Sequence, residues 1–246
     1  MATVIAVTSG KGGTGKTSLV GAVGSCLAAL GHSVLCIDMD VGLRNLDLTL
    51  GLSDRALMDF TDVVEGRCPL EKAVVEHPEI QGLFLLTAPF SLPMGVPEEA
   101  MRDLLRQARV LYDYILLDAP AGLGEGFRLA TCGCDRAIVV STTDASALRD
   151  AQRTVTELMS RGVDQIHLVV NRVQPKLLRK LHTTIDDAMD AAGLPLLGVV
   201  PEDNLVMLSA NRGRPLILCA NKGAAIGYRN IAFRIEGRRV PVMGSR

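Results

Sequence analysis

Residues 9–17 constrain the fold of this chain more than any other stretch. They read Ser-Gly-Lys-Gly-Gly-Thr-Gly-Lys-Thr, and from Gly10 onward they match the G-x-x-x-x-G-K-T phosphate-loop pattern. An apolar, β-branched run over residues 3–8 predicts a buried strand before the loop, and residues 19–30 predict a packed helix after it. Because strand, loop and helix occur in the order that phosphate binding requires, a glycine-rich turn without a ligand is the disfavoured interpretation.

Each residue type in this loop has a part in holding a nucleoside triphosphate. Glycines let the backbone approach phosphate oxygens because no Cβ stands in the way. The backbone N–H groups and the positive end of the following helix then attract negative charge. Lys16 is placed to reach the β- and γ-phosphates, and the Thr17 hydroxyl is placed to bind Mg²⁺. The predicted nucleotide-binding residues of this segment are Gly10, Lys11, Gly12, Gly13, Thr14, Gly15, Lys16, Thr17 and Ser18.

The composition limits the kinds of protein that this chain can be. It has 246 residues, 48% of them hydrophobic, which fits one large α/β domain better than two small ones. The domain is predicted over residues 1–240, with a short tail over 241–246. Aromatic residues make up only 3%, and the formal charge is −1, so a stacking platform or a uniformly basic surface for nucleic acid is disfavoured. No signal-peptide pattern or membrane-spanning run is visible, which predicts a cytoplasmic protein.

The six cysteines are scattered, as is usual in the reducing cytoplasm. Cys26 and Cys36 lie in apolar stretches and are predicted to be small core residues. Cys132 and Cys134 form half of a metal-binding pattern, but no second C-x-C or C-x-x-C accompanies them. A metal or redox role for this pair is therefore the less favoured interpretation.

Apolar runs alternate with helical periodicity along the rest of the chain. This alternation predicts an α/β fold with one doubly wound, mostly parallel sheet and helices on both faces. The expected strands cover residues 3–8, 33–38, 83–87, 114–118, 136–141, 165–170 and 196–200. The expected helices cover residues 19–30, 56–64, 97–108, 145–158, 176–192 and 221–235, and residues 41–52 are expected to form an ordered loop.

Three carboxylates follow predicted strands, at the edge where open α/β sheets bind ligands. Asp38 and Asp40 come at the end of the second strand. We expect at least one of them near Mg²⁺ and the attacking water, the alternative being a capped turn. Asp118 ends an apolar strand in the Walker-B arrangement, which holds a carboxylate near the water shell of the metal. The small residues of 119–124 suit a loop that senses the γ-phosphate by changing shape.

Two weaker motifs have simpler explanations. Lys176, Arg179, Lys180 and His182 form a local basic face, and a solvated helix surface is favoured over nucleic-acid contact. Residues 221–224 read Asn-Lys-Gly-Ala and lack the carboxylate that would pair with guanine.

Further motifs resemble one family. Residues 11–17, Lys-Gly-Gly-Thr-Gly-Lys-Thr, resemble the deviant Walker-A signature of the MinD/ParA ATPases. Residues 38–47, Asp-Met-Asp-Val-Gly-Leu-Arg-Asn-Leu-Asp, look like the switch I segment of MinD-like members. Residues 118–122 look like their switch II, with Ala119 in place of the usual Ser. Further matches are Leu-Arg-Asp-Ala-Gln-Arg at 148–153 and Val-Pro-Glu-Asp at 200–203. The resemblance spans about residues 2–240.

This resemblance implies an ATP-dependent homodimer with the nucleotides sandwiched between its subunits. Lys11 would reach the partner's phosphates, where a mobile cation neutralises developing charge as an arginine finger does. The implied catalytic residues are Lys11, Lys16 and Asp40, with Asp40 orienting the attacking water. The implied Mg²⁺ site consists of Thr17, Asp38 and Asp118, and the implied further nucleotide contacts are Asn171, Arg172 and Pro201, with adenine near Asn171 and Pro201.

The implied function is a slow ATPase that a regulatory protein stimulates, and that positions the division site or a related cell structure. MinD-like proteins resemble one another in a terminal amphipathic helix that docks on the inner face of the cell membrane. Residues 236–246 depart from that pattern, because they contain Pro241 and Gly244 and no Phe, Leu or Trp. Arg238 and Arg239 attract anionic lipid weakly, so we expect no autonomous membrane binding.

The sequence leaves four alternatives open. The chain could be a ParA-like DNA-partitioning ATPase, using the basic face of residues 176–182, or a soluble MinD-like regulator without membrane binding. It could also be an iron–sulfur carrier, which is disfavoured because residues 118–127 contain no Cys and the chain has no C-x-x-C. A small-molecule ligase or kinase would need a substrate pocket that the sequence does not reveal.

Overall fold

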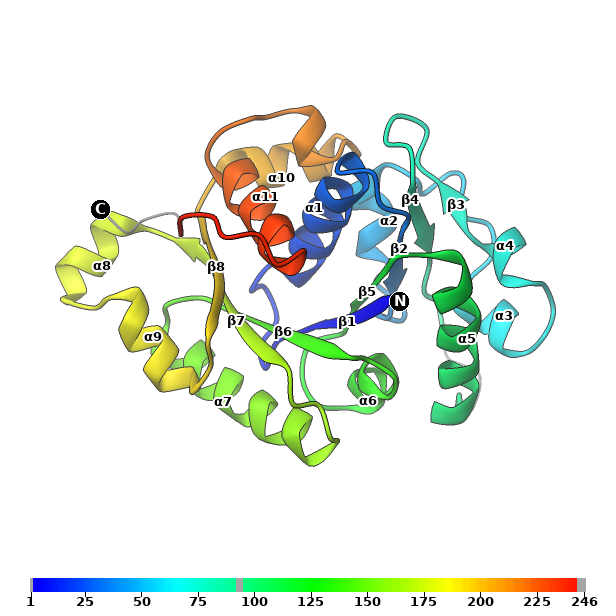
Figure 1. Ribbon diagram of the computed structural model, residues 1–246, viewed down its shortest axis with the longest axis horizontal. Coiled ribbons are helices and arrows are strands. Elements are labelled where there is room, and N and C mark those ends of the chain that lie inside the picture. Colours follow the sequence, from blue (N-terminus) through cyan, green and yellow to red (C-terminus); the bar gives the residue numbers. More distant parts are fainter. Residues whose placement is uncertain (1, 92–94, 243–246) are drawn as a thin grey trace.

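Eight strands form one sheet with helices on both faces in the computed structural model, which describes residues 2–91 and 95–242 (Figure 1). The strands are β1 (Thr3–Thr8), β2 (Val34–Asp38), β3 (Val75–Glu76), β4 (Leu83–Leu86), β5 (Tyr114–Asp118), β6 (Arg136–Ser141), β7 (Ile166–Val173) and β8 (Leu196–Pro201). The longer helices are α1 (Lys16–Ala29), α5 (Glu98–Leu111), α7 (Ala145–Ser160) and α11 (Ala224–Ile235). The shorter helices are α2 (Asn45–Leu50), α3 (Phe60–Val64), α4 (Leu70–Ala73), α6 (Glu125–Thr131), α8 (Pro175–Leu181), α9 (Ile185–Ala192), α10 (Asn204–Asn211) and the 3₁₀ turn Leu216–Leu218.

The sheet is doubly wound, as the sequence predicts. Its strand order is β3-β4-β2-β5-β1-β6-β7-β8, and all neighbours pair in parallel except the short edge strand β3. The chain builds one side of the sheet from β2 to β5 and the other side from β6 onward, so β1 lies where the direction reverses. Open α/β sheets bind ligands at the carboxyl ends of their strands at such a point. The parallel strands end at this edge in Thr8, Asp38, Leu86, Asp118, Ser141, Val173 and Pro201.

The two helical layers bury their apolar surface in different ways. Helices α1, α2, α10 and α11 cover one face of the sheet, and α5, α6, α7 and α9 lie on the other (Figure 1). Helix α1 is apolar on nearly every side because it packs between the sheet and α11. Helices α5 and α7 are amphipathic and bury one stripe each, including Leu104 and Leu105 of α5 and Leu148 and Leu158 of α7. Within the described residues no helix is long and apolar enough to cross a bilayer.

Several predicted boundaries are wrong, and each has a local cause. Residues 41–52 contain helix α2, whose first turn is held by the Asp38 carboxylate accepting a hydrogen bond from the Leu46 amide at 3.1 Å. The single helix expected over 176–192 is two helices, because His182 adopts a left-handed conformation with φ of 51°. Thr184 then begins α9 with a capping box.

Other boundaries differ by less. The helix expected from residue 56 begins only at Phe60, where Asp59 caps it. Helix α10 lies in a segment for which no helix is predicted, and β7 continues past its expected end to Val173. The tail predicted over 241–246 includes residues 243–246, which lie outside the described residues.

Candidate functional site

The two lysines of the phosphate loop lie in contrasting environments. Gly15 takes a left-handed φ of 91° at the end of the loop, and Lys16 begins α1 directly after it. The Lys16 side chain is buried, and its ammonium donates to the Ser9 hydroxyl at 2.8 Å. The Lys11 side chain is exposed, and its ammonium reaches the Ser146 hydroxyl at 3.3 Å, at the start of α7. The Lys16 ammonium therefore lies inside the loop, whereas the Lys11 ammonium lies at the protein surface.

The predicted carboxylates gather beside this loop. Asp38 and Asp118 are register partners on neighbouring strands, and both are buried. Burial raises the pKa of Asp38 to about 6, and burial together with the Asp38 charge raises the pKa of Asp118 to about 8. Neither oxygen of Asp118 makes a hydrogen bond of good geometry, although the Thr17 hydroxyl is near enough to lower its pKa.

Asp40 and Lys16 are coupled electrostatically across the same edge. Burial raises the pKa of the half-buried Asp40, and the Lys16 charge opposes that rise. Burial likewise lowers the pKa of Lys16, against the charges of Asp118 and Asp40. The structure thus brings Lys16, Asp38, Asp40 and Asp118 into one cluster of ionisable groups at the carboxyl edge of the sheet.

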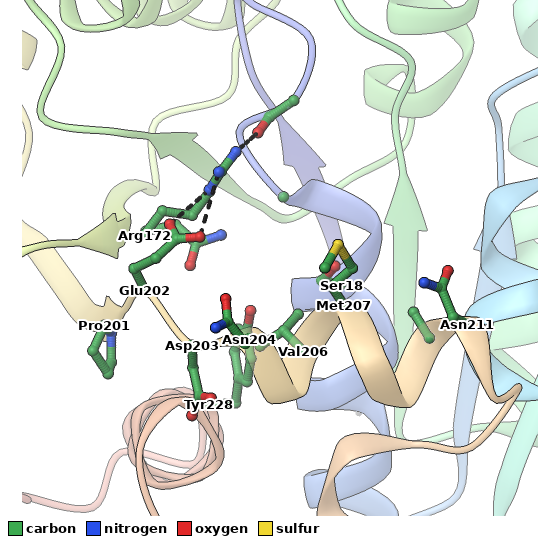
Figure 2. A pocket seen from close by; sticks show the side chains of 14 residues that line it. Ser18, Arg172, Pro201, Glu202, Asp203, Asn204, Val206, Met207, Asn211 and Tyr228 are labelled. Atoms are coloured by element: carbon green, nitrogen blue, oxygen red, sulfur yellow. Dashed lines mark hydrogen bonds and ion pairs between the residues drawn. The ribbon is translucent and has the colours of Figure 1, made fainter.

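A cavity of about 440 Å³ extends from the phosphate loop between β8, α10 and α11 (Figure 2). The predicted residues that line it are Gly13, Gly15, Ser18, Asn171, Arg172 and Pro201. Lining residues that were not predicted are Glu202, Asp203, Asn204, Val206, Met207, Ala210, Asn211 and Tyr228. The cavity continues the phosphate loop on the side where a nucleoside would extend from its phosphates. Helix α10, for which no helix is predicted from the sequence, contributes Asn204, Val206, Met207, Ala210 and Asn211 to the lining.

Asp203 fixes this wall with both of its carboxylate oxygens. One accepts a hydrogen bond from the Leu205 amide at 2.9 Å and caps α10. The other accepts a hydrogen bond from the Ala224 amide at 3.0 Å, in the first turn of α11. An Asp placed just before an apolar run is a sequence signal for a helix start, and this signal could have revealed α10.

Four of the six cysteines lie in apolar surroundings or have raised thiol pKa values. Cys26 and Cys36 are buried in the core, as predicted. Burial raises the pKa of Cys132 to about 11 and that of Cys134 to about 12, so both thiols stay protonated near neutral pH.

Replacing Asp118 by Asn is expected to stabilise the nucleotide-free protein in a pH-dependent way. The folded pKa near 8 lies above the ordinary value of 3.8, so the folded protein holds a proton that the unfolded chain releases. Ionisation of Asp118 therefore lowers the free energy of unfolding of the wild type. This loss of stability is absent below about pH 4, grows as the pH rises, and is constant above about pH 8. We expect the free energy of unfolding of Asp118→Asn in urea to exceed that of the wild type by up to about 5 kcal/mol at pH 7.5 and by up to about 1.6 kcal/mol at pH 5.

The exposed Asp164 provides a control for this measurement, because Asp164→Asn removes one charge without removing a buried one. Equal stability of Asp118→Asn and the wild type at pH 7.5 would contradict the electrostatic description of the site.

A phosphate loop that leaves the central strand of a doubly wound sheet, and that carries a second lysine, defines a P-loop nucleotide-binding protein of the deviant Walker-A class. A family model described as the CobQ/CobB/MinD/ParA nucleotide binding domain matches residues 5–216, and the septum site-determining protein MinD of Bacillus subtilis is 39% identical over 98% of this chain and 92% of its own length. The chain therefore belongs to the MinD/ParA family of ATPases and, within it, to the septum site-determining MinD proteins.

Solved structures agree with this assignment. The MinC:MinD cell division protein complex of Aquifex aeolicus contains a chain that superposes with a TM-score of 0.92 at 36% identity, covering 98% of both chains. MinD of Pyrococcus horikoshii, complexed with Mg-ADP, superposes with a TM-score of 0.83 at 26% identity and 96% coverage of both chains. These comparisons confirm the predicted resemblance and fold class, and they do not favour the DNA-partitioning alternative.

Proposed function

We propose that this chain is an ATP-dependent dimerising switch that hydrolyses ATP to ADP and so controls where the division site is placed. The observation that carries the proposal is the contrast between the two loop lysines. The buried Lys16 faces the interior of its own loop, whereas Lys11 is exposed with its ammonium near Ser146. An outward cation of this kind is available to phosphates that a second copy of the chain binds, as an arginine finger supplied in trans would be.

The residues at the sheet edge fit Mg²⁺. The Thr17 hydroxyl and the carboxylates of Asp38 and Asp118 provide the oxygen donors that this ion prefers. No group of three or more His, Cys, Asp or Glu side chains suited to a metal occurs in residues 2–91 and 95–242. Proteins commonly hold Mg²⁺ through one or two carboxylates together with substrate phosphates. When bound, the ion would neutralise charge on the β- and γ-phosphates.

The protein's own residues have separate tasks in this proposal. Lys16 and the loop amides hold the phosphates, and Asp40, beside Lys16, orients the attacking water. Lys11 of the partner would complete the charge neutralisation. Residues 119–124 are attached to the phosphate loop through the Gly122 amide, which donates to the Ser9 carbonyl at 3.4 Å. A change at the γ-phosphate can therefore reach this segment and alter the dimer surface.

The dimer is tested by light scattering after size exclusion, with ATP, with ADP and without nucleotide. The wild type is expected to dimerise only in ATP. Lys11→Ala is expected to bind ATP and to remain a monomer, because the cation that crosses to the partner is missing. Lys72→Ala, an exposed lysine on α4, serves as the matched control and should dimerise as the wild type does. A Lys11→Ala protein that dimerises normally in ATP would refute the proposed role.

The Aquifex structure is named as a complex of MinD with MinC, so a regulatory protein is also part of our proposal. Such a partner would bind the ATP-dependent dimer and respond to its nucleotide state. The expected result is that a cognate regulator binds the wild type in ATP and not in ADP, as measured by co-elution.

Membrane association is a separate part of the proposal. After α11, residues 236–242 do not continue as an amphipathic helix, and Arg238 and Arg239 supply the basic charge of this stretch. We therefore expect residues 236–242 to give no ATP-dependent pelleting with anionic liposomes by themselves, because two arginines attract anionic lipid only weakly. ATP-dependent pelleting would instead place the switch at the inner face of the cell membrane through its own residues.

A further inference from the structure

Strand β7 contains an irregularity at Asn171 and Arg172. Val170 pairs with Val199 and Val173 pairs with Pro201, so two residues of β7 stand opposite the single residue Val200. Arg172 has a left-handed φ of 57°, which is uncommon for a residue with a side chain. Successive side chains of a regular strand point to opposite faces, whereas a bulge can direct two of them toward one place. Here both side chains reach the phosphate loop.

Each of these side chains holds one carbonyl of that loop. The Asn171 amide nitrogen donates to the Thr14 carbonyl at 2.8 Å, and Asn171 is buried. The Arg172 guanidinium donates to the Gly13 carbonyl at 3.1 Å, and Glu202 holds it from the other side at 2.8 and 3.4 Å (Figure 2). Two adjacent peptide groups of the loop are thus held by two adjacent residues of β7.

Peptide geometry links these carbonyls to phosphate binding. A trans peptide unit is planar, with its C=O and the following N–H pointing in opposite directions. Holding the carbonyls of Gly13 and Thr14 on the protein side therefore directs the N–H groups of Thr14 and Gly15 toward the interior of the loop. The Ser9 hydroxyl donates to the Lys11 carbonyl at 2.6 Å, and this contact orients the Gly12 N–H group in the same way.

We infer that the Asn171–Arg172 bulge positions the amides of the phosphate loop, so that both residues act on the binding of the phosphate chain. This role goes beyond the adenine contacts that the family resemblance implies. It rests on the proposed function, because it requires that the loop binds nucleotide phosphates. Asn171 and Arg172 are positioning residues in this scheme, and the ligand on which they act is a di- or triphosphate chain.

The test is calorimetric titration with Mg²⁺-tripolyphosphate, which has phosphates and no base, alongside Mg²⁺-ATP. Asn171→Leu keeps the size and neutrality of the side chain and removes the donor to Thr14. Arg172→Lys keeps the charge and removes the planar guanidinium that joins Glu202 to Gly13. We expect Asn171→Leu to weaken the binding of both ligands by the same factor, about fivefold to tenfold. Arg172→Lys should weaken the binding of both by about threefold.

Arg214→Ala provides the control, because Arg214 is an equally exposed arginine paired with a glutamate, Glu79, at 3.2 Å. It should leave both affinities unchanged. If the two variants bind tripolyphosphate as the wild type does and lose affinity only for ATP, the residues contact the base alone and the inference is overturned. If the wild type binds neither ligand, the proposed function itself fails.

Discussion

Lys16→Ala is expected to abolish nucleotide binding at micromolar concentrations. The side chain places a buried ammonium at the first position of α1, beside Ser9, where it would contact the β- and γ-phosphates. Charge-assisted hydrogen bonds from such a group contribute about 1.5–3 kcal/mol each, so losing two of them corresponds to a loss in affinity of about a hundredfold or more. Fluorescence titration with a labelled ATP analogue, with circular dichroism to verify the fold, measures this loss.

The matched control is Lys72→Ala, which removes an exposed lysine on α4. It should bind nucleotide as the wild type does. Retained micromolar binding by Lys16→Ala, in a protein that is folded, would show that residues 10–17 are not the phosphate site.

The second large effect is expected at Asp40. Asp40→Ala should retain ATP-dependent dimerisation and lose turnover by a factor of about 10²–10⁴, the range typical for a group that positions or accepts a proton. The backbone amide of Asp40 donates to the Asp38 carboxylate at 2.8 Å, and this contact does not need the Asp40 side chain. The substitution therefore leaves the local turn its hydrogen bond while removing the carboxylate beside the phosphates.

Phosphate release under saturating ATP and light scattering of the same sample separate the two effects. Asp54→Ala, at an exposed position in the same region of the chain, should hydrolyse ATP normally. Normal turnover by Asp40→Ala would remove Asp40 from its proposed role, and loss of the dimer would assign it to assembly.

The strands are the part of the fold that the sequence predicts best. The bounds of β1, β5 and β6 coincide with the expected runs at 3–8, 114–118 and 136–141. These strands lie in the interior of a parallel sheet covered on both faces, so each reads as a continuous apolar segment. Such a pattern depends only on neighbouring residues, which is why the sequence alone locates it.

Helix boundaries are harder to predict, because contacts from elsewhere in the chain determine them. The first turn of α2 depends on Asp38, eight residues before Leu46, and spacing alone does not reveal that contact. The break between α8 and α9 lies at His182, where apolar periodicity continues across a change in backbone direction.

Part of the candidate site can likewise be predicted from the sequence, and part of it cannot. The phosphate loop is a local motif, and Asp38 and Asp118 end strands, so their positions follow from the sequence. The wall of the cavity follows only from the folded chain, since it joins α10 to α11 through Asp203 and places Tyr228 in the lining. No periodicity or spacing links these segments before the chain folds.

The two hydrogen bonds of Asp203 have a consequence for genetics. The same side chain caps α10, which lines the nucleotide cavity, and holds the start of α11, which covers α1. A nonsense mutation shortly before codon 224 would therefore remove the Ala224 partner of Asp203 together with the helix that covers α1. Such an allele is expected to behave as a complete loss of function, and not as a switch that has merely lost its terminal segment.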